Sequence, residues 1–248
     1  MVRSYIGITG VTNRFEVQKI SVSFRMRQRS LMVGVLASQA TVNGGTNKYP
    51  NRYPPHNRLG SIFTSHPRAL NLVHYHSDDA RSMGSQLRKV RNLAGDYCHG
   101  IQLNIVWPDI SDLSYYLESY PDDNLVLQVG DRALSSLKGA LIPLVEKLKD
   151  YRGKVQFVLF DMSGGKGLPL KPQDTLNLLR EVINSDLGFK IVVAGGLGPD
   201  TLDLVLPIIE SVPDISIDAE SALRNEDDTL NLDRCAEYLL KAQSLFIG

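Results

Sequence analysis

The chain has 248 residues, of which 43% are hydrophobic, so it can bury one sizeable core, and a single domain over 1–248 is expected. Lys plus Arg and Asp plus Glu both number 27, and the net charge of zero provides no global field for binding nucleic acid or an anionic membrane. The sequence has no signal-like N-terminal stretch and no run of about 18 apolar residues, which predicts a soluble, cytoplasmic protein.

Eight apolar runs of strand length recur along the chain. They cover residues 5–9, 31–37, 72–76, 101–105, 125–129, 155–161, 191–194 and 215–218. Segments with helical spacing separate most of them, at 80–93, 110–117, 134–149, 174–183 and 199–209, and a final helix is expected over 232–242. Buried strands joined by helical crossovers indicate a parallel sheet, and eight units favour closure into a (β/α)8 TIM barrel. A doubly wound open sheet is the alternative fold.

The connection after the second predicted strand is unusually long. Residues 38–61 contain the run Asn-Gly-Gly-Thr-Asn and prolines at 50, 54 and 55, so they are too long and irregular for a simple turn. We expect a loop with a functional role or a disordered lid.

Polar residues occupy the strand positions whose parity directs them toward the mouth of the barrel. This set comprises Gly7, Thr9, His74, His76, Gln102, Asn104, Gln128, Asp161, Ser216 and Asp218. Each one alone could be a structural residue that bonds its neighbours or a trapped water. Their joint occurrence is more informative, because active sites of this fold lie at the carboxyl ends of the strands.

Asp161 is the first candidate for catalysis. It ends the apolar run 155–160 and precedes a glycine-rich segment at 163–167. A carboxyl group beside apolar walls can act as a general acid or base. His74 and His76 rank second, because a histidine near a strand end is more often structural.

No metal or cofactor is expected. The cysteines Cys98 and Cys235 are far apart and lack any Cys-x-x-Cys spacing, so both are interpreted as ordinary thiols. The remaining histidines, His56, His66 and His99, show no spacing suited to a metal.

A phosphate site is predicted after the seventh strand. Residues 192–200, VVAGGLGPD, read as a strand, a glycine turn and a helix start, so Gly195, Gly196 and Gly198 can bring backbone N–H groups close to an anion. Barrels of this kind commonly build a phosphate site from the loops after strands seven and eight, and a short extra helix is expected to begin within 216–221. Asp218 and Glu220 would disfavour a phosphate if their side chains faced it.

These motifs together resemble phosphoribosylanthranilate isomerase, a (β/α)8 barrel that converts an N-linked ribose phosphate to its ketose by Amadori rearrangement. The resemblance spans most of the chain. The segment YIGITGVTN at 5–13 is similar to the family's V-K-I-C-G-I-T-N, and GIQLN at 100–104 to G-V-Q-L-H. The most specific matches are FD with GGKG at 160–167 to L-D with G-G-x-G, and VAGGLGP at 193–199 to L-A-G-G-L-N-P. DISIDAE at 214–220 resembles D-V-S-S-G-V-E, and NRY at 51–53 resembles S-x-R-Y.

The resemblance implies roles for individual residues. Asp161 becomes the general acid that opens the ribose ring, and Arg52 the residue that holds a substrate carboxylate. Gln102, Asn104 and Gln128 are assigned to substrate binding. The implied phosphate site consists of Gly165, Gly167, Gly195, Gly196, Gly198, Ser216, Asp218 and Ala219.

Four positions depart from the family pattern. Thr9 stands where the family has its catalytic cysteine, and an alcohol is not a thiolate-like base near neutral pH. Gly7 replaces the motif's lysine, Asn104 the histidine after the fourth strand, and Asp218 the glycine of the phosphate loop. Catalysis therefore requires a substitute base, for which His76 and Asp218 are the candidates.

Three functions are compatible with this sequence. The leading hypothesis is an isomerase-like enzyme for a phosphorylated sugar or N-glycosyl ribose phosphate, with Asp161 and Thr9 or His76 at the catalytic centre. The second is a barrel that binds a phosphorylated ligand, or a protein partner, without catalysis. A lyase or aldolase is third, because no lysine lies inside an apolar strand. Arg132 and Arg224 are candidates to neutralise an anionic substrate, and homodimerisation stays open.

Overall fold

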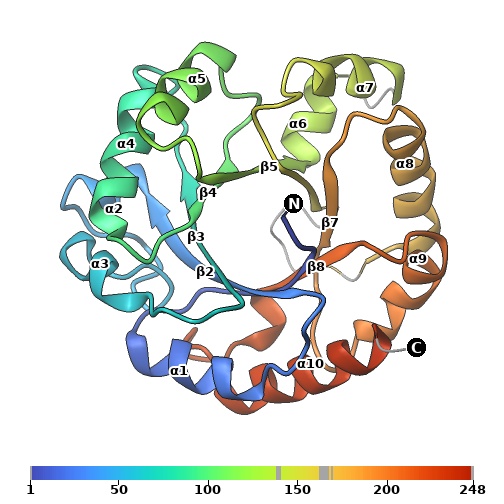
Figure 1. Cartoon of the computed structure of the whole chain (residues 1–248). Helices are drawn as coiled ribbons and strands as arrows, with labels where there is room; N and C mark the ends of the chain where they lie inside the picture. The colour runs from blue at the N-terminus through green and yellow to red at the C-terminus, as the bar shows by residue number, and fades with distance from the viewer. Residues whose placement is uncertain (1, 138–140, 162–167, 169, 247–248) are drawn as a thin grey trace.

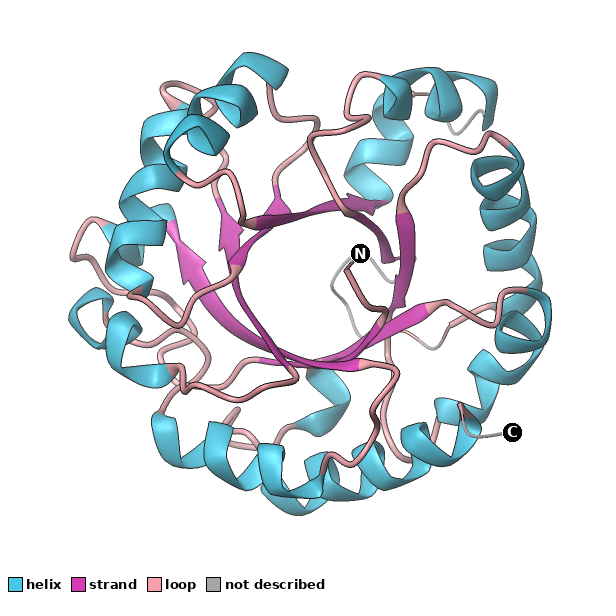
Figure 2. Cartoon of the chain, viewed as in Figure 1, coloured by secondary structure: helices cyan, strands magenta, loops and turns pink. Residues whose placement is uncertain are grey.

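Eight parallel strands close into a barrel that is surrounded by helices (Figures 1 and 2). This computed structural model describes every residue except 1, 138–140, 162–167, 169 and 247–248. The strands are β1 (Tyr5–Thr9), β2 (Ser30–Ser38), β3 (Ala69–His76), β4 (Gly100–Asn104), β5 (Asn124–Gly130), β6 (Phe157–Asp161), β7 (Lys190–Ala194) and β8 (Ser216–Ala219). Because β1 pairs with both β2 and β8, the sheet has no edge, and the open-sheet alternative is excluded.

Each of the eight predicted strands is confirmed. Their residues read as nearly continuous apolar runs because one face packs inside the barrel and the other packs against the helices. The boundaries move outward by at most three residues in β2 and β3, where polar end residues such as Ser38 still pair with the neighbouring strand.

Helices follow the strands around the outside of the barrel. They are α1 (Arg14–Ser23), α2 (Gln39–Val42), η1 (His56–Arg58), α3 (Leu59–Ile62), α4 (Met83–Ala94), α5 (Ile110–Ser119), α6 (Asp131–Ser136), α7 (Leu141–Lys149), α8 (Pro172–Asn184), η2 (Leu202–Val205), α9 (Leu206–Ser211), η3 (Ser221–Leu223) and α10 (Leu232–Leu245). Four of the six predicted helices are confirmed nearly as expected, and η3 is the short helix expected after the eighth strand.

Two predicted helices and two connections differ from expectation. The helix predicted over 134–149 is two helices, α6 and α7. The helix predicted over 199–209 begins as the 3-10 turn η2 and restarts as α9, whose first turn contains Pro207. Helix α1 was not predicted, and residues 38–61 are not wholly irregular, because they include α2, which Ser38 caps, together with η1 and the first residues of α3.

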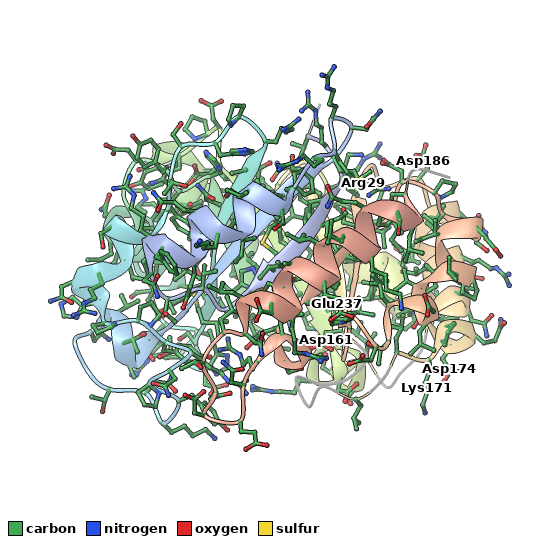
Figure 3. The ribbon with its side chains drawn as sticks, turned by 90° about the horizontal axis from the view of Figure 1, so that it is seen from below. Arg29, Asp161, Lys171, Asp174, Asp186 and Glu237 are labelled. Atoms are coloured by element: carbon green, nitrogen blue, oxygen red, sulfur yellow. The ribbon has the colours of Figure 1, made fainter. Side chains whose placement is uncertain are left out.

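The interior of the barrel changes character along its axis. An apolar cluster fills the part nearer the amino ends of the strands, with Tyr5 of β1 and Phe157 of β6 in ring contact at 5.1 Å between centroids. Toward the carboxyl ends the buried side chains become polar and include Thr9, His74 and Asp218. Figure 3 shows Asp161 near the end of the molecule where α8 begins, while Arg29 lies at the opposite end. The polar layer therefore lies at the mouth.

The last helix completes the ring of helices beside the first. Gln243 of α10 donates from Nε2 to the Ser23 carbonyl at the end of α1 and accepts from the Arg25 amide (3.0 and 2.6 Å), and Figure 1 shows the two helices side by side. No helix in the described part of the chain is long and apolar enough to span a membrane.

A charged network at the base of the barrel yields a stability prediction. Asp123, which is 8% exposed and precedes β5, accepts from Arg91 Nε at 2.6 Å and from the Tyr116 hydroxyl at 2.5 Å. Asp123→Ala leaves a largely buried guanidinium unpaired, so we expect a loss of about 3 kcal/mol in the free energy of unfolding, measured with denaturant. The exposed neighbour variant Asp122→Ala should cost less than about 0.5 kcal/mol, and equal losses in both would contradict the network's role.

Candidate functional site

A cavity of about 110 Å³ occupies the mouth of the barrel, at the carboxyl ends of the strands. Its walls come from the ends of several strands and from the loops that follow β2, β7 and β8. The lining residues are Leu36, Arg52, His74, Gln102, Asn104, Gln128, Leu159, Asp161, Ala194, Gly195, Gly196, Leu197, Asp218, Glu220 and Ser221. Nine of the residues singled out in the sequence are thereby brought together, namely Arg52, His74, Gln102, Asn104, Gln128, Asp161, Gly195, Gly196 and Asp218.

Two carboxyl groups face this cavity from nearby strands. Asp161 ends β6, and its register partner in β7 is Ala194, which in turn pairs with Asp218 of β8. The two aspartates therefore lie at the same level of the barrel with one strand between them, which places their Cα atoms roughly 10 Å apart. A small ligand in the cavity can contact both.

Asp218 is held by a buried network. Thr9 Oγ1 lies 2.9 and 3.1 Å from its two carboxyl oxygens and donates to them, and is 3.4 Å from His74 Nδ1. Desolvation by burial raises the pKa of Asp218 to about 8, and the carboxylates of Glu220 and Asp161 act in the same direction, while the Thr9 hydrogen bond opposes the shift. Burial also lowers the pKa of His74 to about 3, so its imidazole is neutral. Burial therefore favours the uncharged form of both Asp218 and His74 near neutral pH.

Gly7 provides the space that Asp218 occupies. The two residues are register partners in the β1–β8 pair, and a Cβ atom at position 7 would lie 2.7 Å from Asp218 Oδ1. Compared with the isomerase pattern, side-chain volume has moved from β1, where the motif has lysine, to β8, where it has glycine. The departures at positions 7 and 218 thus form one complementary pair.

The loop after β7 forms one wall of the cavity. Gly195 and Gly196 adopt φ angles of +118° and +57°, which residues other than glycine rarely adopt, and both line the cavity. Gly198 does not line it. Its amide donates to Thr201 Oγ1 at 3.0 Å and its backbone packs against Ala222 of η3, so this glycine joins the β7 loop to the segment after β8.

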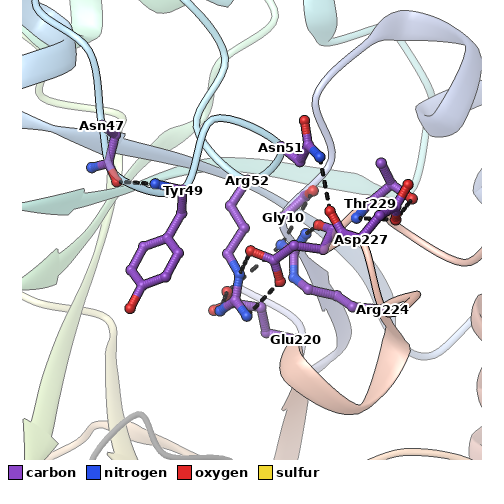
Figure 4. Close-up of polar contacts among 10 residues, drawn as sticks. Gly10, Asn47, Tyr49, Asn51, Arg52, Glu220, Arg224, Asp227 and Thr229 are labelled. Carbon is purple, nitrogen blue, oxygen red and sulfur yellow. Dashed lines mark hydrogen bonds and ion pairs between the residues drawn. The ribbon is translucent and has the colours of Figure 1, made fainter.

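Arg52 connects the long segment after β2 to the segment after β8 (Figure 4). Its guanidinium is 2.6 Å from both carboxyl oxygens of Asp228 and 3.4 Å from Glu220 Oε1. Glu220 also faces Arg224 Nη2 at 3.6 Å, and the Arg224 side chain is only 2% exposed. The arginine predicted to hold a substrate carboxylate therefore already binds two carboxylates of its own chain.

The other predicted site residues lie elsewhere. His76 is directed to the Asn104 carbonyl, 3.1 Å from its Nδ1, and does not line the cavity. Ser216 accepts from the Tyr5 amide at 3.0 Å, deep in the barrel wall, and Ala219 is buried outside the cavity lining. Gly165 and Gly167 lie outside the described residues.

Two glutamines form a polar wall of the cavity. Gln102 Nε2 donates to Gln128 Oε1 at 3.3 Å, and the buried Oε1 atom of Gln102 has no protein partner among the described residues. This leaves an acceptor at the cavity that a ligand hydroxyl or amide could satisfy.

Sequence reasoning omitted Glu220 and Ser221 from the site, although parity with Asp218 would have placed Glu220 toward the mouth. Three acids, Asp161, Asp218 and Glu220, now line the cavity. Glu220 therefore opposes a phosphate by its charge, whereas Asp218 does so only above the pH at which it loses its proton. The described residues contain no group of three or more His, Cys, Asp or Glu side chains suited to a metal ion.

Neither cysteine lies at the mouth. Cys98 precedes β4 and Cys235 lies in α10, and both thiols are buried and unpaired. Burial raises the pKa of Cys98 to about 11 and that of Cys235 to about 12, so neither supplies a thiolate near neutral pH. The base that the isomerase family takes from cysteine has no cysteine substitute here.

No family model and no curated protein matches the sequence of this chain. Solved structures do match. Phosphoribosyl anthranilate isomerase from Thermotoga maritima is similar with a TM-score of 0.68 and 17% identity over 98% of this chain and 100% of that chain. A phosphoribosyl anthranilate isomerase in complex with reduced 1-(o-carboxyphenylamino)-1-deoxyribulose 5-phosphate has a TM-score of 0.64 and 16% identity over 98% and 100%.

A decarboxylase shares the same architecture. Orotidine 5'-monophosphate decarboxylase from Methanocaldococcus jannaschii, complexed with the inhibitor BMP, has a TM-score of 0.56 and 11% identity over the whole of both chains. At these identities the similarity shows the fold alone, and one fold hosts several chemistries. The resemblance to the isomerases is confirmed at the level of the fold.

The raised pKa of Asp218 predicts a pH-dependent stability. Its ordinary value is 3.8, so between about pH 4 and 8 the folded state keeps a proton that the unfolded state has lost, and stability falls as pH rises through this window. Asp218→Asn cannot ionise and can still accept from Thr9. We expect its melting temperature, relative to the parent protein, to rise between pH 4 and 8 and to level off above.

The exposed variant Asp203→Asn provides the control, because Asp203 forms only a surface ion pair with Lys241. Its difference from the parent should stay constant between pH 5 and 8. A constant difference for Asp218→Asn over the same range would show that burial does not hold the proton on Asp218.

Proposed function

We propose that this protein is an acid–base isomerase of a phosphorylated sugar or an N-glycosyl ribose phosphate, with Asp161 and Asp218 as its two proton-transfer groups. The observation that carries the proposal is that carboxyl groups from β6 and β8 line one cavity at the carboxyl end of the barrel. Catalytic residues of this fold lie at that end. The fold shared with phosphoribosyl anthranilate isomerases supports the same reaction class.

Asp161 acts as the general acid in this proposal. It would protonate the ring oxygen of the bound sugar, which opens the ring to a Schiff base when the anomeric substituent is an amine. A second group must then remove the C2 proton to complete the shift from aldose to ketose. A side chain transfers a proton only to an atom within hydrogen-bond distance, and a small cavity holds its ligand at such a distance.

Asp218 takes the place of the family cysteine as that second group. Its pKa of about 8 is close to the roughly 8.5 of an ordinary thiol, so it can exchange a proton near neutral pH. Thr9, at the cysteine position, serves as a positioning residue because its hydroxyl donates to the Asp218 carboxyl. His76 is the weaker candidate for the base, since it does not line the cavity.

The loops after β7 and β8 are proposed to hold the phosphate. Gly195, Gly196 and Ser221 line the same cavity as the two aspartates, and backbone N–H groups at such glycine turns bind anions. The charge of Glu220 opposes a phosphate, but Arg52 and Arg224 lie beside it and offset that charge. Gly165 and Gly167, in the loop after β6, remain predicted contacts of the phosphate.

A non-catalytic ligand-binding protein is the second candidate. Arg52, which would bind the substrate carboxylate in the isomerase pattern, is engaged by Asp228 and Glu220. A barrel in which that arginine has become structural could keep the cavity and lose the original substrate. Both candidate functions include a ligand bound in the cavity, but only the isomerase converts it to a product.

Asp161→Asn tests the catalytic proposal directly. We expect kcat/KM to fall by a factor of about 10² to 10⁴, because the variant cannot transfer the proton. In the parent protein kcat/KM should rise with pH up to about 8, where Asp218 loses its proton and becomes a base. Assays would follow isomerisation of ribose phosphates and N-aryl ribosylamine phosphates across pH 6 to 9.

The exposed variant Asp203→Asn should retain full activity. Full activity in Asp161→Asn would reject Asp161 as the acid. A rate that falls as pH passes 8 would instead make Asp218 the proton donor and exchange the roles of the two aspartates.

Thermal shift measurements separate binding from catalysis. Ribose phosphates should raise the melting temperature, because a ligand at about 100 times its Kd adds about 2.7 kcal/mol of stability. The reduced carboxyphenylamino deoxyribulose phosphate should raise it less, because Arg52 is already bound to Asp228 and Glu220. Stabilisation without turnover of any sugar phosphate would favour the non-catalytic candidate. No stabilisation by any of these ligands would reject the phosphate site.

A further inference from the structure

A second cavity opens beside the mouth, between the loops that follow β3, β4 and β5. Its volume is about 420 Å³, against about 110 Å³ for the mouth cavity. The two cavities share three lining residues, Asn104, Gln128 and Asp161. A ligand whose reacting atom lies beside Asp161 can therefore extend into this second cavity, which we call the side pocket.

The side pocket has a mixed lining, in which apolar side chains stand beside polar and charged ones. Ile105 and Val106 line it from the segment after β4, Ala133 lines it from α6, and Ala80 lines it from the segment after β3. A pocket of several hundred Å³ that combines apolar surface with polar groups is typical of sites for small organic ligands. Its volume and the apolar part of its walls suit an aromatic or heterocyclic ring.

Trp107 fixes one wall in place. Its backbone has a φ of +46°, which is uncommon for a residue other than glycine, and its indole N–H lies 2.8 Å from Ser136 Oγ and 3.2 Å from the Ala133 carbonyl. These contacts tie the segment that carries Val106 to α6 on the opposite wall. Strained backbone of this kind persists where the surrounding structure determines it.

The charges around the side pocket decide which rings it accepts. Asp78, Asp131 and Asp161 line it, whereas its one cation among the described lining residues is Arg132. Arg132 Nη1 is already paired with Asp78 at 2.9 Å. The lining thus offers more hydrogen-bond acceptors than donors and repels an additional negative charge.

We propose that the side pocket is a subsite for an aromatic or heterocyclic arm of the substrate that is uncharged or cationic and carries N–H donors. The assignment rests on the proposed function, because the arm belongs to the molecule that reacts beside Asp161. It differs from the arm of the ligand bound to the phosphoribosyl anthranilate isomerase, which carries a carboxylate.

Two fragments of equal shape test the charge preference. 2-Aminobenzamide and 2-aminobenzoate differ mainly in the charge of one substituent, and neither requires the sugar phosphate to bind. The amide resonances of Ile105 and Val106, which line this pocket, together with the indole N–H resonance of the adjoining Trp107, the chain's only tryptophan, report binding here. At low ionic strength we expect the amide to bind about threefold to tenfold more tightly than the carboxylate, with the ratio shrinking as salt is added.

Two variants locate the effect in the side pocket. Val106→Arg changes a residue that is 39% exposed, so the fold tolerates it, and should weaken the amide and favour the carboxylate. Asp78→Asn removes one negative charge and frees Arg132, so the ratio should fall toward one or reverse. Glu118→Gln removes an exposed charge that does not line the pocket and should leave the ratio unchanged.

Equal or tighter binding of 2-aminobenzoate to the parent protein would overturn the inference, as would the absence of any shift in the Ile105 and Val106 amide resonances with either fragment. The failure of the proposed function is a separate result. Sugar phosphates that neither bind nor react would reject that function while shifts of the Ile105 and Val106 resonances with the expected ratio still supported a ring subsite.

Discussion

The pairing of β1 with β8 is the contact on which both the barrel and its mouth depend. It closes the sheet and removes the last edge, and it makes Gly7 and Asp218 register partners. Because Gly7 has no side chain, the Asp218 carboxyl can lie over it, within reach of the Thr9 hydroxyl and away from water. The same closure therefore creates the raised pKa of Asp218, and with it a proton that can be exchanged near neutral pH.

The strands and their order could be predicted from the sequence, because strands buried on both faces leave a nearly continuous apolar signal. Helix α1 left no such signal. Its buried residues are Val17 and Ile20, but Phe15 and Val22 are 58% and 64% exposed, so apolar residues occupy both faces and obscure the helical period. The helix predicted over 134–149 and the one over 199–209 had the right composition, yet local breaks such as the one at Pro207 divide them.

The candidate site was predictable to the extent that strand parity determines it. Asp161, Gln102, Gln128 and Asp218 line the mouth as their positions imply. Strand parity directs His74 and His76 to the same face, so it could not show that only His74 lines the cavity. His76 instead contacts the backbone carbonyl of Asn104 at the rim. Nor could it reveal that Arg52 binds Asp228, since the two are separated by 176 residues and belong to different connections.

That last contact has a consequence for how the protein matures. The mouth is complete only when Arg52, from the segment after β2, has met Asp228 and Glu220, which follow β8 near the end of the chain. Asn51 repeats the link with a bond to the Asp227 carbonyl at 2.8 Å. Contacts between such distant segments form only after the intervening chain is ordered. During synthesis the chain thus contains Asp161 before it contains Glu220 and Asp228, the residues that fix Arg52 at the rim of the mouth.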